Sequence, residues 1–395
     1  MNHRNRFRVF VCICISVLLA GLLTASTGLT QTPPRRAVQQ IDRVSMRNKL
    51  KALGYQKRGG ISRAKTDSSD ERFRSLPHFS SSFTVGGVTY PYTMVGHPPQ
   101  SGRPSNIKTV IVPLRMRFGF FGPNQDVFVD FDPSFAVKNI LNSPIYQDAS
   151  FPNGVGQFND QMQRATFWNK MDPPRQWHVR LAAPKVLHTV DIEVTPETGQ
   201  LFDLGGGDLL GDVLIDFMDA QAQTIIQLAG LDPDEVPIFV TQNCFAEALG
   251  YHTAISATTD NGKENLQTYI YTSWLDENLV GPLLADISTL NHESAELIND
   301  PFINNVVPTW MYPPASDSRT VCSDNPFLEV GDPQGNGPTF DDFPTVVVPL
   351  NGFNYHLQDL VMLPWFADEV PSSAENGWYD FPATTQIHEP AVYCP

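Results

Sequence analysis

The residues best suited to chemistry in this chain stand together at 291–301, in the run NHESAELINDP. On a helix, His292 and Glu296 would be one turn apart on the same face, where both side chains can bind one metal ion. Glu293 would lie a step round the axis, placed to hold and deprotonate a metal-bound water, as the intervening glutamate does in H-E-x-x-H metalloproteases. The spacing therefore predicts a metal-dependent hydrolase, most simply a metallopeptidase, with Glu293 as its catalytic base.

The second ligand position of this motif carries Glu296 where H-E-x-x-H proteins have a histidine. A carboxylate oxygen is an accepted zinc ligand, but its negative charge makes a bound water less acidic and lets Ca²⁺ compete for the site. We therefore expect Zn²⁺, with Ca²⁺ as the alternative. A third ligand must come from elsewhere in the chain, and the sequence offers three candidates: His252, Glu329 and Asp332.

The motif has a second interpretation, because a short pattern of this kind also arises by chance on an ordinary solvated helix. The alternative function is a non-catalytic extracellular or cell-wall-associated protein in which the same residues form a structural ion site. Three other histidines are expected to be structural: His178, His188 and His356. The sequence contains no G-x-S-x-G motif, which argues against the common serine-hydrolase arrangement.

Hydrophobic periodicity predicts the elements that must position these residues. Residues 280–298 have a largely helical pattern that Pro301 would end, and short apolar runs at 237–241 and 266–272 predict buried strands. About 310 residues without an internal repeat fit one large α+β domain. We expect a zincin-like mixed sheet with an active-site helix over 81–395, with a loop-rich C-terminal part from 301.

The remaining elements follow from the same patterns. Two aromatic and β-branched runs around a glycine pair predict a hairpin, and the clearest helical period is that of 209–228. We expect the hairpin at 83–92, strands at 109–118, 177–194 and 345–349, and helices at 156–169 and 209–228.

Spaced motifs between about 240 and 366 resemble a pattern shared by secreted bacterial proteins and plant phosphate-induced (EXORDIUM-like) proteins. That pattern reads H-E-x-x-E-x-x-[TN]-[DN]-P and then E-[IV]-G-D near a cysteine; here HESAELINDP is followed by Trp310 and by EVGD at 329–332. The upstream G-Y-H at 250–252 and the downstream Tyr355, Leu357 and Gln358 are also similar. The order of sheets and helices resembles that of zincin metallopeptidases. The resemblance implies a metallopeptidase-like fold.

The N-terminus is typical of an export signal. Three arginines precede a fifteen-residue apolar run, Val9–Leu23, which small and polar residues follow. A helix needs about twenty apolar residues to cross a bilayer, so we expect a signal peptide over 1–30 and no stable membrane insertion after its removal. The sequence therefore predicts a secreted or periplasmic protein.

Charge divides the rest of the chain into two parts. Residues 32–65 carry ten Lys/Arg and one acid, Asp42, whereas residues 66–395 carry 14 basic and 41 acidic residues. So acidic a body excludes nucleic acid as a general electrostatic partner and suits cationic or neutral peptide or protein substrates. The segment 31–80 is predicted to be a basic linker or pro-segment. It would either dock on the acidic body and be cut away, or remain a solvated leader.

Three cysteines remain after removal of the signal peptide: Cys244, Cys322 and Cys394. Export permits disulfides, so an odd number predicts one pair and one free or metal-bound thiol. Loop-like sequence around Cys322 and Cys394 favours that pair.

Overall fold

The computed structural model describes residues 38–54, 58–59, 73–120, 126–171, 176–258, 264–313, 321–335 and 345–395. Residues 35–395 form one compact unit. The predicted signal peptide, 1–30, lies outside the described residues. Among the described helices, none combines the length and the apolar character needed to cross a membrane.

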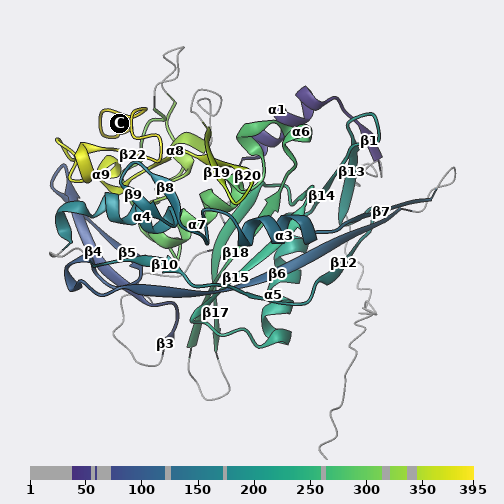
Figure 1. Cartoon of the computed structure of the whole chain (residues 1–395), viewed down its shortest axis with the longest axis horizontal. Coiled ribbons are helices and arrows are strands. Elements are labelled where there is room, and N and C mark those ends of the chain that lie inside the picture. The colour runs from purple at the N-terminus through teal and green to yellow at the C-terminus, as the bar shows by residue number, and fades with distance from the viewer. Residues whose placement is uncertain are drawn as a thin grey trace, which may run out of the picture. The chain divides into compact units, whose positions relative to one another are not determined.

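A mixed sheet forms the centre of this unit (Figure 1). Its main path begins at β10 (Val179–Leu181) and continues through β6 (Ser105–Phe120), β15 (Glu235–Gln242), β18 (Glu264–Trp274) and β17 (Gly250–Thr258). The pairs β6–β15 and β15–β18 are parallel, whereas β17 runs antiparallel to β18. The described part of the chain is therefore a mixed α/β fold with more strand than helix.

Short strands complete the edges of this sheet. The predicted strand at 177–194 is broken into β10, β11 (Lys185–Val186) and β12 (Val190–Val194), and His188 is exposed between the last two. β11 and β12 run parallel to β6, and β7 (Val127–Phe131) runs antiparallel to it. Two more short strands, β2 (Arg58–Gly59) and β3 (Phe73–Arg74), pair with β17 and β18.

Helices cover both faces of the sheet. Successive side chains of a strand point to opposite faces, so the sheet contributes to two separate cores. Ile107 and Ile111 of β6 belong to the core on the face covered by α4 (Phe158–Thr166) and α7 (Ser288–Asn299). Val110 and Val112 belong to the opposite core, which packs against α5 (Ile215–Ala229). Figure 1 shows α4 and α7 on one side of the strands and α5 on the other. With both faces buried, the central strands are nearly continuous apolar runs.

The helix predicted at 209–228 is wrong in its first part. Residues Leu209–Val213 form the strand β14, and the helix α5 begins only at Ile215. β14 pairs antiparallel with β13 (Gly199–Asp203) across a turn in which Gly205, Gly206 and Gly207 all have positive φ. Pairing with β13 satisfies the backbone of β14, and such a tertiary partner overrides a local helical period. Two further strands, β1 (Val38–Gln40) and β16 (Cys244–Phe245), complete this small sheet.

Part of the segment 31–80 packs on the folded body. The helix α1 (Arg43–Leu53) is capped by Asp42, whose carboxylate accepts hydrogen bonds from two backbone N–H groups of the first turn. Met46 and Leu50 are fully buried, and Arg43 forms an ion pair with Asp208 of the acidic body. A basic segment docked in this way is compatible with a pro-segment. Its cleavage remains a prediction.

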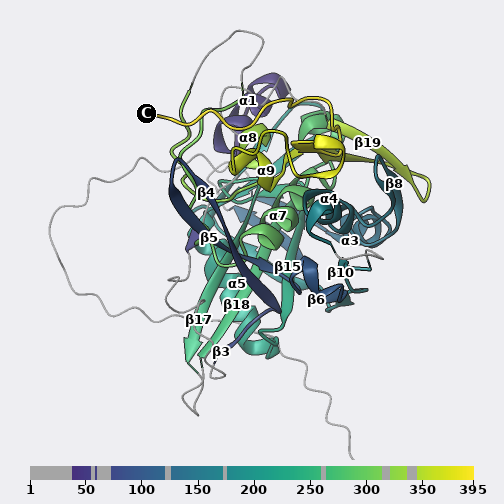
Figure 2. The same cartoon turned by 90° about the vertical axis from the view of Figure 1, so that its left-hand side faces the viewer.

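The C-terminal part lies over the same face of the sheet as α4 and α7 (Figures 1 and 2). Loops connect its elements, which are α8 (Asp332–Gly335), β19 (Thr345–Leu350), β20 (Phe353–Gln358), β21 (Leu360–Val361), α9 (Leu363–Phe366) and β22 (Asp380–Phe381). The expected disulfide Cys322–Cys394 joins the segment before α8 to the segment after β22, and Cys244 is free and buried. The predicted hairpin is also confirmed, as β4 (His78–Val85) and β5 (Val88–Val95).

Candidate metal centre

The helix α7 carries the predicted motif and lies against β17 and β18, with every one of its residues buried. Gly250 allows this close approach. A Cβ at position 250 would lie 2.6 Å from Thr289 Cγ2 and 3.0 Å from Glu293 Cγ, too near for any other residue without displacement of the helix. The glycine of the G-Y-H motif therefore seats α7 on the sheet, with His252 two residues further along the same strand.

The predicted pair on one helix face is confirmed. His292 Nε2 lies 3.0 Å from Glu296 Oε1. On the other side of the ring, His292 Nδ1 lies 2.9 Å from Oε1 of Gln358, whose own amide donates to Gly331 O at 2.7 Å. Because this orientation leaves Gln358 Oε1 able only to accept, Nδ1 carries the proton. Nε2 is left with its lone pair, which is the tautomer of a metal-binding histidine held by an outer partner.

The EVGD segment supplies three different contributions to the same place. Gly331 N donates to Glu296 Oε1 at 3.1 Å, and a Cβ on Gly331 would lie 2.3 Å from His292 Nδ1. Asp332 Oδ1 lies 3.7 Å from His292 Nε2. Glu329 reaches further, toward His252. The glycine is therefore required for the loop to bring its two acids against α7.

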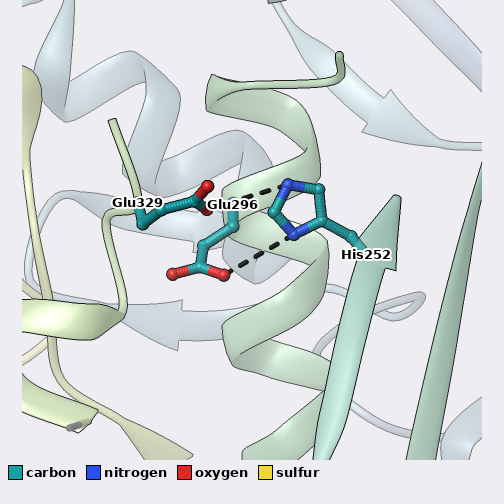
Figure 3. A group of neighbouring side chains, drawn as sticks. All are labelled: His252, Glu296 and Glu329. Carbon is teal, nitrogen blue, oxygen red and sulfur yellow. Dashed lines mark ion pairs between the residues drawn. The ribbon is translucent and has the colours of Figure 1, made fainter. Parts of the chain in front are cut away.

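His252 extends from β17 toward the two glutamates Glu296 and Glu329, which approach its ring from the same side (Figure 3). Its Nδ1 lies 3.6 Å from Glu296 Oε2 and 3.4 Å from Glu293 Oε2, and its Nε2 lies 3.7 Å from Glu329 Oε2. Two sets of possible ligands result, each with atoms within 4.8 Å of one another: His252, Glu296 and Glu329, and His292, Glu296 and Asp332. All three candidates for the third ligand therefore converge on the motif, and Glu296 belongs to both sets.

These side chains form what we name the α7 centre: His252, His292, Glu293, Glu296, Glu329 and Asp332. None of these residues is more than 8 % exposed. Burial raises the pKa of Glu293 well above its ordinary value, with Glu296 and Glu329 adding to the rise, and burial lowers the pKa of His292. Four carboxylates and two imidazoles so far from water are costly unless a positive charge compensates them. The nitrogen and oxygen donors fit a divalent transition metal such as Zn²⁺.

Comparison with known proteins adds no relative. The sequence matches no protein-family model, and no curated protein or solved structure matches it. The resemblance to EXORDIUM-like proteins and to zincins stays a prediction. The geometry of the α7 centre is therefore the basis of the function proposed below.

His356 and His178 lie outside the α7 centre. His356 Nδ1 lies 2.6 Å from Asp286 Oδ2, and its backbone N–H donates to Asp286 Oδ1 at 2.9 Å. The side-chain hydrogen bond between His356 and Asp286 raises the pKa of His356. His178 Nδ1 lies 2.8 Å from Asp160 Oδ2. Both histidines have the direct carboxylate partner expected of a structural residue.

Sequence reasoning missed the roles of Gln358, Gly331 and Gly250. All three stand within motifs quoted for the resemblance, which was the available signal. What each residue does depends on contacts with α7, far away in the sequence, and no local pattern reveals such contacts.

Proposed function

We propose that the chain is an exported, metal-dependent hydrolase of the metallopeptidase kind, with a zincin-like arrangement of sheet and active-site helix. One observation carries the proposal. His292 Nε2, oriented by the contact between Nδ1 and Gln358, faces two carboxylates: that of Glu296, on the helix that also bears Glu293, and that of Asp332 in α8. The Cys322–Cys394 disulfide supports export, since such bonds persist mainly outside the cytoplasm.

His292, Glu296 and Asp332 would hold the ion. Bonds of about 2.1 Å to a tetrahedral ion place its donors about 3.4 Å apart. The separations from His292 Nε2, 3.0 Å to Glu296 and 3.7 Å to Asp332, bracket that value. A divalent ion there would act as a Lewis acid toward a substrate carbonyl and would lower the pKa of a coordinated water.

Glu293 would be the general base. Its Oε2 faces His252 Nδ1 at 3.4 Å, and its Oε1 is buried with no hydrogen-bond partner in the described part of the chain. That second oxygen is available to accept a proton. Burial raises the pKa of Glu293 well above its ordinary value, and a carboxylate of higher pKa is a stronger base, which suits this role.

Burial favours a second candidate function, a structural ion site in a non-catalytic extracellular protein. A substrate carbonyl would have to reach side chains that are at most 12 % exposed. Asp332 is the most exposed of them and lies in α8, within the C-terminal part. Catalysis would therefore require access from the side of α8, whereas a structural ion would not.

Metal analysis of the purified chain, combined with a peptidase assay on an unfolded protein, separates these functions. We expect bound Zn²⁺ in the wild type and in Glu293→Gln, with hydrolysis at least about a hundredfold slower in the variant because its base is lost. Glu277→Gln, a change at an exposed glutamate remote from the α7 centre, is the control and should leave both properties unchanged. If both proteins hold metal and are equally inert, the structural function is correct. Unchanged metal content in His292→Ala would show that the ligand assignment is wrong.

A further inference from the structure

The two oxygens of Glu296 face different histidines. Oε1 lies 3.0 Å from His292 Nε2, whereas Oε2 lies 3.6 Å from His252 Nδ1. We propose that Glu296 bridges two divalent ions, one held with His292 and Asp332 and the other with His252 and Glu329. This inference rests on the metal site proposed above and adds a second ion to it.

The surroundings of His252 define the second position. Its Nε2 lies 3.3 Å from the backbone carbonyl of Asp300, an acceptor that favours a proton on that nitrogen. Nδ1 then presents a lone pair toward Glu293 Oε2 and Glu296 Oε2, both of which can only accept when ionised. A cation between them resolves this contact between acceptors.

Distances distinguish an ion site from a direct ion pair. Charge-assisted hydrogen bonds are about 2.7–2.9 Å long. In this chain, His356 with Asp286 and His178 with Asp160 have contacts of 2.6 and 2.8 Å. The contacts of His252 Nδ1 with Glu293 and Glu296 are 3.4 and 3.6 Å. Both are too long for that bond, and the 3.6 Å between Nδ1 and Glu296 Oε2 is close to the separation of about 3.4 Å between two donors of one ion. Glu329 completes this group of possible ligands, whose atoms lie within 4.8 Å of one another.

Charge gives an independent reason for two ions. The α7 centre contains four carboxylates, and histidines that bind metal are neutral. With the carboxylates ionised, one divalent ion would leave a net charge of −2 in a buried place, and two would bring it to zero. Isolated buried charge is costly, so the second ion is favoured.

A second ion on His252 would lie beside Glu293, because both residues face each other at 3.4 Å. Paired ions about 3.5–4 Å apart occur in aminopeptidases and phosphatases, where they clamp the attacking and leaving oxygens of the reaction. The proposal therefore places the general base next to the His252 position rather than next to His292.

Counting metal in the purified full chain tests this inference. We expect two equivalents of Zn²⁺ in the wild type, one in Glu329→Gln, one in Asp332→Asn and none in Glu296→Gln, since each outer acid serves one ion and Glu296 serves both. Asp212→Asn removes a buried carboxylate of β14 outside the α7 centre and should keep two equivalents. Loaded with Mn²⁺, the wild type should give the electron paramagnetic resonance spectrum of an exchange-coupled pair, and each single-acid variant that of an isolated ion.

The same count separates failure of this inference from failure of the proposed function. One equivalent in the wild type, with an isolated Mn²⁺ spectrum, overturns the bridge and leaves a single metal site. No bound metal in a folded wild-type chain overturns both. Circular dichroism of each variant confirms that a lost equivalent does not reflect an unfolded chain.

Discussion

Two kinds of contact between imidazole and carboxylate occur in this molecule, and they differ in what they require. His356 with Asp286, and His178 with Asp160, are each one ring facing one acid at hydrogen-bond distance. In such a pair the imidazole and the carboxylate are each other's hydrogen-bond partners. No additional ligand is needed to explain either pair.

The α7 centre has two rings and four acids, and most of its contacts between ring and acid are 3.4–3.7 Å long. Its rings are held from outside, His292 by Gln358 and His252 toward the carbonyl of Asp300. Rings oriented by outer partners, with acids at the separation of co-ligands, are typical of metal sites. The difference is the one that the proposed site requires, in which an ion, rather than a proton, would compensate the buried acids.

The largest effect is expected from removing the charge of Glu296, the acid that belongs to both sets of possible ligands. Glu296→Gln keeps an oxygen for the hydrogen bond from Gly331 N–H but loses the negative charge. A ligand at a hundred times its Kd stabilises the native state by about 2.7 kcal/mol, and we expect Glu296→Gln to lose this metal-dependent gain. Thermal unfolding with and without Zn²⁺ measures it. A variant still stabilised by Zn²⁺ as strongly as the wild type would refute the assignment.

A smaller effect is expected from adding a methyl group next to His292. Gly331→Ala would place a Cβ 2.3 Å from His292 Nδ1, so the ring or the loop must move. Overpacking of this kind costs about 1–3 kcal/mol, and displacement of the ring should also weaken metal binding. Urea unfolding of the metal-free chain gives the first quantity. Gly119→Ala is the control for a glycine change, because a Cβ there would meet only ring carbons of Phe128, at 3.7 and 3.9 Å. Equal losses in the two variants would mean that Gly331 has no special relation to His292.

Removing the outer partner of the ring should lower metal affinity without removing a ligand. Gln358→Met has a similar length but cannot accept from His292 Nδ1. Loss of such a partner typically weakens binding 10- to 100-fold, equivalent to about 1.4–2.7 kcal/mol. Competition with a chromophoric chelator measures the Kd. An unchanged Kd would contradict the role assigned to Gln358.

The stability contributed by the pair His356 and Asp286 should depend on pH rather than on metal. Asp286 and, more weakly, Glu277 raise the pKa of His356 in the folded state. The stability from this pair is therefore fully present below the unfolded pKa of about 6.5 and is lost as the pH rises through the folded pKa. His356→Gln should cost about 1 kcal/mol at pH 6 and less at pH 9, with or without Zn²⁺. Urea unfolding at both pH values checks this, and a cost that grows with pH would reverse the assigned sign.

Much of the α7 centre was predictable because its chemistry is local. The spacing of His292 and Glu296 places them on one face of any helix, and α7 is that helix. The sequence could not choose among His252, Glu329 and Asp332, because convergence of β17 and the C-terminal loop on α7 depends on tertiary packing. In the structure all three lie at the centre, whereas the sequence led us to expect one of them as the third ligand.

The fold was predictable where the pattern and the tertiary environment agree. The strands β15 and β18 lie at the predicted runs because both of their faces are buried. Residues 209–213 have apolar positions that fit a helix equally well, and only pairing with β13 makes them a strand. Similarly, the helical pattern of 280–298 is interrupted: α6 (Glu277–Val280) ends before Gly281, which has a φ of 84°, and α7 begins only at Ser288.

Anomalous X-ray diffraction at the zinc absorption edge, from crystals of the purified chain, tests the central claim most directly. The account predicts strong anomalous density about 2.0–2.2 Å from His292 Nε2 and from an oxygen of Glu296, with a second peak beside His252 if Glu296 bridges two ions. Absence of anomalous density at the α7 centre in crystals grown with Zn²⁺, with the imidazoles hydrogen-bonded directly to the glutamates, would contradict it.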